Sequence, residues 1–220
     1  MKKILKTLID YSLFEKYDKD YFINNKILPL FENDISIKMA VCKNSKLETI
    51  KNDFNKVISF LEIDELELLF MISHIDQKTL LYSMALKAIS QNSFEKYVDK
   101  FLQELLSFSI NLRASDIHIE QYKDVILFKF RIDGRLKTFF AFYSEFFKLI
   151  SSYIKLISTL DMTQIRLPQD GRFALNIEDK KYDFRVSTMP TLEAESIVLR
   201  ILDNKNINKN FQTLGISSNL

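Results

Sequence analysis

Four arginines lie close together in sequence near the end of the chain, at Arg166, Arg172, Arg185 and Arg200. Arg185 and Arg200 each stand in a run of alternating apolar and polar residues, so both side chains point away from the apolar face of a strand. If the two strands are neighbours, the guanidinium groups converge, and paired forks of N–H donors suit phosphate oxygens. The spacing alone also permits salt bridges to Asp183 or Glu195, so both interpretations stay open.

A second group of reactive side chains, Asp116, His118 and Glu120, shares one face of another alternating run. His74 and Cys42 are the remaining histidine and cysteine, which leaves no second cluster of ligands. We therefore expect no metal site, and a hydrogen-bonded structural role for His118. The sequence has no Gly-x-Ser-x-Gly, His-Glu-x-x-His or Walker A motif, and three glycines are too few for a phosphate-cradling loop. We expect no catalytic residue in these 220 residues and no ATP hydrolysis by them alone.

The composition is that of a globular protein, with 47% hydrophobic residues and 19 phenylalanines to fill a core. The formal net charge is +2 and the lysines are spread along the chain, so we expect no direct nucleic-acid partner, which would need clustered cations. A single cysteine excludes an internal disulfide and fits a reducing compartment. No apolar run reaches the roughly 20 residues that span a bilayer, and no cleavage site follows the basic start. We expect a cytoplasmic protein.

The apolar periodicity predicts an α+β protein of two small domains, 1–92 and 93–205, with the polar segment Ser90–Ser93 at their boundary. In the first domain the pattern predicts these elements: a helix over 4–17, a hairpin of strands 27–31 and 35–41 with Pro29 at a sheet edge, a helix over 47–61, a strand over 66–72, and a helix capped by Asp76. Cys42 is expected to be a small buried residue near the end of a strand.

The second domain is expected to be an antiparallel sheet packed by helices. Its predicted elements are a helix over 94–112, strands over 116–120, 125–132 and 135–140, a helix over 146–160, and strands over 172–177, 182–189 and 196–202. Asp133-Gly134 is a strong signal for a two-residue hairpin turn, which needs residues that tolerate positive φ. On the strand over 125–132, Lys129 and Arg131 lie on the face opposite the phenylalanines.

Five motifs, in order along the chain, resemble the second N-terminal domain of the secretion ATPase superfamily. They are Ala114–Glu120 (ASDIHIE), Phe130–Gly134 (FRIDG), Arg166–Arg172 (RLPQDGR), Asp183–Pro190 (DFRVSTMP) and Val198–Leu202 (VLRIL). Members of this superfamily of traffic ATPases power type II secretion, type IV pilus assembly and competence (DNA uptake) in bacteria. The resemblance covers about residues 94–215 and implies a PAS-like α+β domain that precedes a RecA-like ATPase domain in a hexameric ring.

By this resemblance, Arg185 and Arg200 match arginines that contact the phosphates of ATP, a cofactor held with Mg in the ATPase domain. Arg131, Arg166 and Arg172 stand in the other matching motifs and are further candidates for phosphate contact. The resemblance implies no cofactor bound tightly by these residues alone.

Residues 21–89 resemble, over a shorter pattern, the first N-terminal domain of the same proteins, which docks on inner-membrane platform proteins. Residues 206–220 resemble the linker toward the ATPase domain. We therefore expect the N-terminal half of a longer polypeptide that is hexameric when complete and peripheral at the inner membrane through its partners. The alternative is a stand-alone PAS-like interaction or sensory module without ATPase activity.

Overall fold

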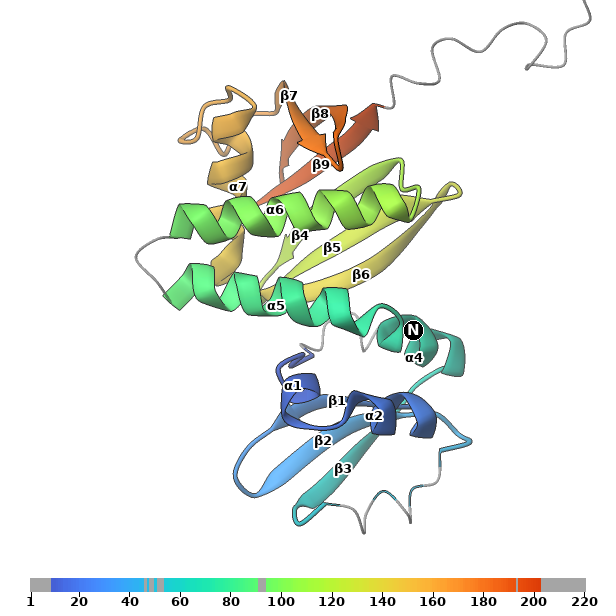
Figure 1. Cartoon of the computed structure of the whole chain (residues 1–220). Coiled ribbons are helices and arrows are strands. Elements are labelled where there is room, and N and C mark those ends of the chain that lie inside the picture. Colours follow the sequence, from blue (N-terminus) through green and yellow to red (C-terminus); the bar gives the residue numbers. More distant parts are fainter. Residues whose placement is uncertain are drawn as a thin grey trace, which may run out of the picture.

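The computed structural model describes residues 9–45, 47, 50, 54–90, 94–192 and 194–202. These residues form an α+β structure with two sheets, one of three strands and one of six (Figure 1). The six-stranded sheet is antiparallel throughout and helices pack on it, as the sequence predicted. The fold class is thus confirmed.

The three-stranded sheet has the order β1-β2-β3. Its strands, and the two short helices that precede them, are α1 (Leu13–Lys16), α2 (Lys19–Asn25), β1 (Ile27–Glu32), β2 (Ser36–Val41) and β3 (Val57–Glu62). β1 and β2 form the predicted hairpin, Pro29 lies in the edge strand β1, and Cys42 is buried directly after β2. β3 runs parallel to β2.

Glu32, at the end of β1, ties α1 to this sheet. Its carboxylate accepts hydrogen bonds from Lys16 and Tyr17 and forms an ion pair with Lys56 at 2.8 Å. Burial by itself would favour the neutral acid, but the bonds from Lys16, Lys56 and Tyr17 outweigh it and lower the pKa of Glu32 to about 2. The carboxylate therefore stays charged over the whole physiological range.

Two predictions for this region are wrong. Residues 57–62 form β3 instead of continuing a helix, because the β-branched pair Val57-Ile58 suits a strand and β2 offers a pairing edge. Residues 66–72 belong to helix α4 (Glu65–Ile72) instead of a strand, since a continuous apolar run does not reveal its period. The overlooked signal was Asp64, whose side chain accepts the backbone N–H of Leu66 as a helix cap.

Two further predictions need adjustment. The helix over 4–17 falls partly on residues outside the described part of the chain, and among residues 9–17 only Leu13–Lys16 is helical. Helix α5 (Ile75–Ser90) begins before Asp76, so this residue lies in the first turn instead of capping the helix. Asp76 instead accepts a hydrogen bond from Lys19 at 2.7 Å.

The six-stranded sheet has the order β6-β5-β4-β9-β8-β7. Its strands and flanking helices are α6 (Phe94–Asn111), β4 (Asp116–Tyr122), β5 (Val125–Ile132), β6 (Arg135–Tyr143), α7 (Glu145–Ile157), β7 (Gln169–Ile177), β8 (Lys180–Pro190) and β9 (Glu195–Leu202). Each was predicted within a few residues. Asp133 and Gly134, both at positive φ, make the predicted two-residue turn between β5 and β6.

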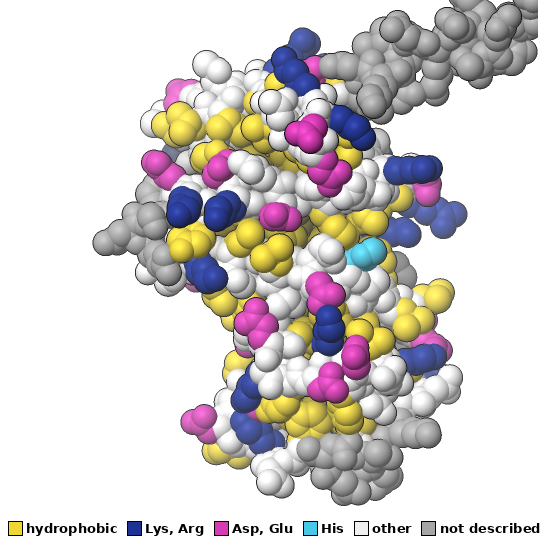
Figure 2. Space-filling model, viewed as in Figure 1, with side chains coloured by type: hydrophobic (Ala, Val, Ile, Leu, Met, Phe, Trp, Pro, Cys, Tyr) yellow, Lys and Arg dark blue, Asp and Glu magenta, His cyan; other side chains and the backbone are white. Residues whose placement is uncertain are grey.

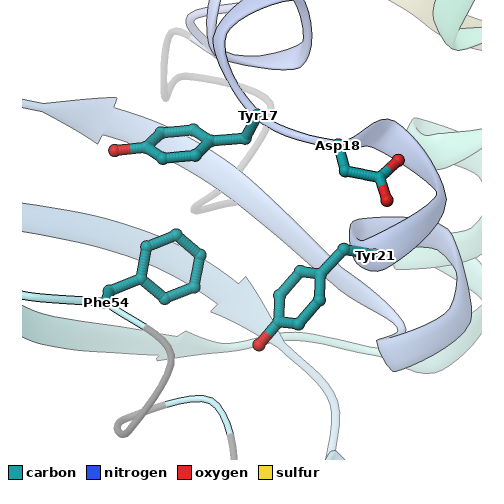
Figure 3. Close-up of a pocket in the computed structure, with 4 residues that line it drawn as sticks. All are labelled: Tyr17, Asp18, Tyr21 and Phe54. Atoms are coloured by element: carbon teal, nitrogen blue, oxygen red, sulfur yellow. The ribbon is translucent and has the colours of Figure 1, made fainter.

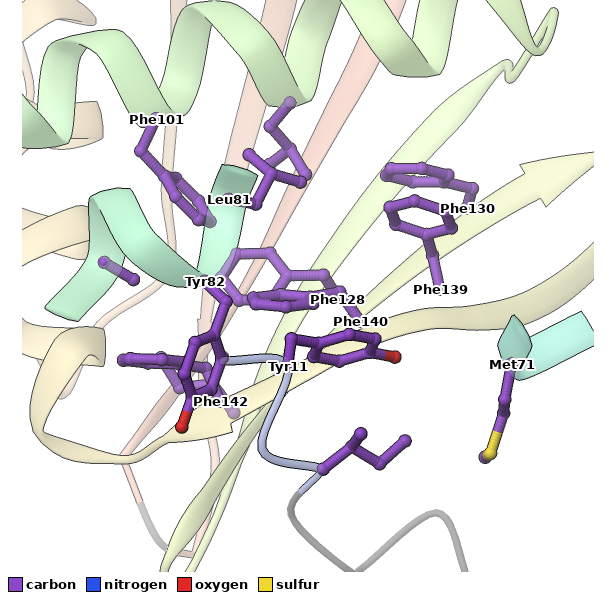
Figure 4. Packing of buried hydrophobic residues seen from close by; sticks show 14 of the residues in the cluster. Tyr11, Met71, Leu81, Tyr82, Phe101, Phe128, Phe130, Phe139, Phe140 and Phe142 are labelled. Carbon is purple, nitrogen blue, oxygen red and sulfur yellow. The ribbon is translucent and has the colours of Figure 1, made fainter. Parts of the chain in front are cut away.

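One face of this sheet packs against α5, α6 and α7 through aromatic side chains (Figures 1 and 4). The ring of Phe101 on α6 lies 5.4 Å from that of Phe128 on β5 and 4.7 Å from that of Phe146 on α7, measured between centroids. Phe130 stacks on Phe139 at 4.8 Å. Strand alternation sends these rings to the helical side, which leaves the intervening residues for the other side.

The core continues from one sheet to the other without a break. Tyr11, which is 1% exposed, lies at 6.1 Å from the ring of Tyr82 on α5 and at 5.7 Å from that of Phe140 on β6 (Figure 4). Tyr82 also meets Phe142 edge to face at 5.1 Å. Helix α5, which lies in the first predicted domain, therefore packs on the sheet of the second. The domain limits at 92 and 205 stay predictions.

Lys78 is a fully buried lysine on α5. Its Nζ donates hydrogen bonds to the carbonyl oxygens of Phe70 at 3.0 Å and Met71 at 2.9 Å, near the end of α4, and lies 4.9 Å from the centroid of the Phe139 ring. Burial lowers the pKa of Lys78 to about 7, because removal from water disfavours the charged amine. Among the described residues its hydrogen-bond acceptors are neutral carbonyl oxygens. Lys78 thus links α5 to α4 and β6, and its amine loses its proton near neutral pH.

We predict that the free energy of unfolding rises between about pH 7 and 9. The unfolded lysine, with a pKa near 10.4, keeps a proton that the folded Lys78 releases above about pH 7. The penalty for burying the charge is therefore complete below pH 7 and fades as the pH rises, with a slope approaching about 1.4 kcal/mol per pH unit. Urea denaturation of wild type and Lys78→Met would show the slope in the first and a flatter profile in the second. Lys87→Met, an exposed lysine on the same helix, is the control; equal slopes in all three proteins would contradict the prediction.

Candidate functional site: a row of arginines across the sheet

The antiparallel register places five charged residues side by side, one on each of five adjacent strands. In order across the sheet they are Arg131 on β5, Asp116 on β4, Arg200 on β9, Arg185 on β8 and Arg172 on β7. We call this set the arginine row. Directly opposed residues of an antiparallel pair share a face, with Cβ atoms roughly 5 Å apart. The row therefore forms one strip of side chains on the face that the aromatic core does not use.

Asp116 is the centre of the arginine row. Its carboxylate accepts a hydrogen bond from Nε of Arg200 at 2.8 Å and forms an ion pair with Nε of Arg131 at 3.3 Å. Ser115 Oγ donates to the same carboxylate at 2.8 Å. Burial favours the neutral acid, but the bonds from Arg200 and Ser115 and the charge of Arg131 outweigh it and lower the pKa of Asp116. The carboxylate is therefore charged at neutral pH.

Arg185 is held less firmly than Arg200. Its Nη2 lies 3.5 Å from Oδ1 of Asp170 on β7, at the long limit of a hydrogen bond, and both side chains are more than half exposed. Asp170 has a shorter partner in Ser187, whose Oγ donates to it at 2.6 Å. These bonds lower the pKa of Asp170, the one from Ser187 most. Arg200 pairs with Asp116 and Arg185 with Asp170, whereas Glu195 pairs with Lys155.

The arginine row is cationic and open to solvent. The side chains of Arg200 and Arg185 are 62% and 52% exposed, and Arg172 is exposed as well. The row holds four guanidinium groups and one carboxylate, and a second carboxylate, Asp170, lies against Arg185, so the arginines outnumber these two carboxylates by two. On the face seen in Figure 2, Lys and Arg side chains lie among Asp and Glu side chains. The row can accordingly bind anions through N–H donors that face water.

Four of the five arginines named from the sequence come together in the row. Arg166 does not: it lies exposed in the segment between α7 and β7. His118 lies on the same face as Asp116, but its buried Nε2 has no hydrogen-bond partner among the described residues, against the expectation of a hydrogen-bonded role. Glu120 is bound by Lys129 and Tyr122. In the described part of the chain, no group of three His, Cys, Asp or Glu side chains could hold a metal ion.

A buried ion pair that the sequence did not reveal fixes the start of β9. Lys155 on α7 and Glu195 are 1% and 3% exposed, and Nζ of Lys155 lies 2.8 and 2.7 Å from the two carboxylate oxygens. Lys155 also donates to the carbonyl oxygen of Gln164 at 2.7 Å. A signal existed: Glu195 has the same parity as the inward-facing Ile197 and Leu199, so its carboxylate needed a buried cation.

A small pocket lies far from this chemistry in the fold, beside α2. The rings of Tyr17, Tyr21 and Phe54 and the side chain of Asp18 line a volume of about 240 Å³ (Figure 3). Phe54 is 5.4 Å from Tyr17 and 5.8 Å from Tyr21 between ring centroids. The Asp18 carboxylate caps α2 by accepting the backbone N–H of Asp20. Phe54 borders residues 51–53, which lie outside the described part, so we place no ligand in this pocket.

The fold and the arginine row together define a class of protein: an α+β module whose antiparallel sheet packs helices on one face and presents a cationic strip on the other. The family model described as "Type II/IV secretion system protein" matches residues 90–220. This match covers more than half of the chain and includes the whole arginine row. The chain belongs to the type II/IV secretion system protein family.

Individual relatives agree with this assignment. The type II secretion system protein E of Aeromonas hydrophila is 40% identical over 118 residues, which are 54% of this chain and 24% of that protein. The type II secretion system ATPase E of Vibrio cholerae serotype O1 is 36% identical over 119 residues, with the same two shares. The putative type II secretion system protein E of Escherichia coli K12 is 39% identical over 121 residues, 55% of this chain and 24% of that protein. The chain covers about a quarter of the length of these relatives. None of its described helices is both long and apolar enough to cross a membrane.

We predict that Lys155→Met destabilises the protein by roughly 3–5 kcal/mol, because it leaves the Glu195 carboxylate buried without its cation. The double variant Lys155→Met/Glu195→Leu should recover most of the loss, since replacing both partners removes the unpaired charge. Lys19→Met, which breaks an exposed pair with Asp76, is the matched control and should cost much less stability, because water screens an exposed ion pair. Urea denaturation measures all three. Equal losses for Lys155→Met and Lys19→Met would show that burial adds nothing to the pair.

Proposed function

We propose that this chain forms the N-terminal, non-catalytic part of a hexameric traffic ATPase that powers type II secretion, type IV pilus assembly or DNA uptake. The carrying observation is the opposed pair Arg185 and Arg200, which stand directly across from each other on neighbouring strands in the exposed row. The names of the relatives place a secretion ATPase among similar proteins and support this reading. Residues 206–220 would then lead toward a RecA-like ATPase domain.

In this proposal the arginines contact the phosphates of ATP that the ATPase domain holds. The residues present fit that role, since guanidinium forks match phosphate oxygens and the row has more cations than its carboxylate can neutralise. Bound ATP with Mg supplies a phosphoanhydride bond that can be hydrolysed. Mg would be held outside this chain's described residues, which offer no cluster of metal ligands. Arg185 and Arg200 then offset the negative charge of the phosphates, with Arg131 and Arg172 beside them.

Engagement and release of the phosphates would move the six-stranded sheet relative to the ATPase domain. The continuous core from Phe140 through Tyr11 to the three-stranded sheet would carry that motion toward residues 1–92. That first domain would dock on inner-membrane platform proteins, so the assembly would be cytoplasmic and peripheral at the inner membrane. Residues 93–205 would form the PAS-like second domain.

The reading frame beyond the codon for Leu220 tests the proposal directly. We expect a Gly-x-x-x-x-Gly-Lys-[Ser/Thr] motif within a few tens of residues, because the phosphates need a Walker A loop that the 220 residues lack. Sequencing the gene downstream decides the matter. A stop codon there would sink the motor interpretation and leave the stand-alone interaction or sensory module.

We predict that Arg185→Ala lowers ATP turnover of the complete protein at least about 10-fold, less than the roughly 100-fold typical of losing one preorganised donor, because the Arg185 side chain is weakly held. The fold should persist, because the Arg185 side chain is half exposed and weakly bonded. Steady-state phosphate release measures turnover and circular dichroism measures folding. Lys180→Ala removes an exposed cation outside the row and should leave turnover unchanged. Normal turnover in Arg185→Ala would refute the phosphate role, and the 220 residues alone should bind ATP weakly or not at all.

A further inference from the structure

We infer that Asp116 is a positioning residue that orients Arg200 and Arg131 so that their terminal guanidinium nitrogens face a polyphosphate. The inference rests on the proposed function, because it concerns the same row. It assigns a role to a carboxylate that carries the wrong charge to bind an anion itself. The arginines of the row then differ: Arg200 and Arg131 are oriented before a ligand binds, and Arg185 is not.

The contacts of Asp116 show how the orientation arises. Each carboxylate oxygen meets a different arginine, Oδ1 with Nε of Arg200 at 2.8 Å and Oδ2 with Nε of Arg131 at 3.3 Å. An arginine has five N–H groups, of which Nε carries one and the two Nη atoms carry four. Asp116 thus engages the inner nitrogen of each side chain. The Nη atoms lie farther out, and in Arg131 one of them also donates to the carbonyl oxygen of Gly134 at 3.3 Å.

Asp116 can hold other groups because it is itself fixed. Its side chain is 5% exposed, and Ser115 Oγ donates to it at 2.8 Å. The backbone of Ser115 is bonded on both sides: its N–H donates to the carbonyl oxygen of Arg131 at 2.9 Å, and its carbonyl accepts the N–H of Ile201 at 3.0 Å. The carboxylate therefore stands on backbone that is tied to β5 and to β9, the two strands that carry its arginines.

Arg185 provides the contrast within the same row. Its partner Asp170 is 61% exposed, and the 3.5 Å contact uses a terminal Nη atom, the atom that a ligand would need. A ligand therefore has to displace Asp170 and order the Arg185 side chain, whereas Arg200 is already ordered through Nε. Ordering a long side chain during binding weakens affinity, so the prepared arginine contributes more.

The substitution Asp116→Asn distinguishes positioning from simple electrostatics, because the two predict opposite changes in anion affinity. Asp116→Asn removes a negative charge beside two arginines, and a purely through-space effect would then tighten anion binding. Positioning predicts weaker binding, because a neutral asparagine side chain cannot form an ion pair with either guanidinium group and has one carbonyl oxygen in place of two carboxylate oxygens. Asp170→Asn removes a carboxylate from the same face and serves as the matched control, for which we expect unchanged or tighter binding.

The test titrates the 220-residue chain with inorganic tripolyphosphate and follows the ¹⁵N Nε–Hε resonances of the arginines by NMR. We expect Asp116→Asn to weaken tripolyphosphate binding roughly 3- to 10-fold, the effect of losing the order of one or two side chains, and to shift the Hε resonances of Arg200 and Arg131. Asp116→Asn binding that equals or exceeds wild type would overturn the positioning role. The fold of each variant is checked by circular dichroism.

A measurement on the wild type keeps the inference testable even where Asp116→Asn does not fold. The heteronuclear NOE of the ligand-free chain should show rigid Nε–Hε groups in Arg200 and Arg131 and a mobile one in Arg185; an Arg200 as mobile as Arg185 would overturn the inference. Arg200→Ala and Arg185→Ala separate the two proposals. If they weaken tripolyphosphate binding and Asp116→Asn does not, only the positioning role fails. If neither weakens it, the phosphate role of the row fails as well.

Discussion

The register of the six-stranded sheet depends on where one buried carboxylate meets two arginines. Asp116 faces Arg131 across β4–β5 and Arg200 across β4–β9. A slip of one residue in either pairing would turn the arginine toward the aromatic core and leave the carboxylate buried without a partner, and both changes carry a large desolvation cost. The ion pairs thus stabilise the register of β4 against β5 and β9. The same alignment brings Arg185 and Arg172 into the row on strands that never touch Asp116.

The two faces of this sheet divide the work between stability and recognition. On the helical side Phe128 and Phe140 pack against Phe101, and Phe142 packs against Phe146. These rings bury large areas of apolar surface. The opposite face carries the charged residues of the arginine row. Because strand side chains alternate, each core residue fixes its charged neighbour in space, and a rigid core gives the arginines fixed mutual spacing. The buried pair of Lys155 and Glu195 adds a tie from α7 to the first residue of β9.

The region between the two sheets combines apolar packing with one buried cation. Tyr11 enters the ring cluster of α5 and β6, while Lys78 satisfies carbonyl oxygens near the end of α4. Through these rings the two sheets share one close-packed core, so a displacement of one sheet is transmitted to the other. Lys78 makes the stability of this region depend on pH, since burial lowers the pKa of its amine to about 7.

Local sequence pattern was enough to predict the strands of the large sheet, their inward and outward residues, the Asp133-Gly134 turn and the outward direction of Arg185 and Arg200. All of these follow from local period and turn chemistry. Local pattern failed at β3 and α4, where a short apolar run fits a helix and a strand equally well until a neighbouring strand or a cap decides. The position of Asp116 between two arginines and the contact of Lys155 with Glu195 became visible in the folded protein. Such pairs join residues as far apart in sequence as Asp116 and Arg200, and the period of a strand carries no information about which distant strand will lie beside it.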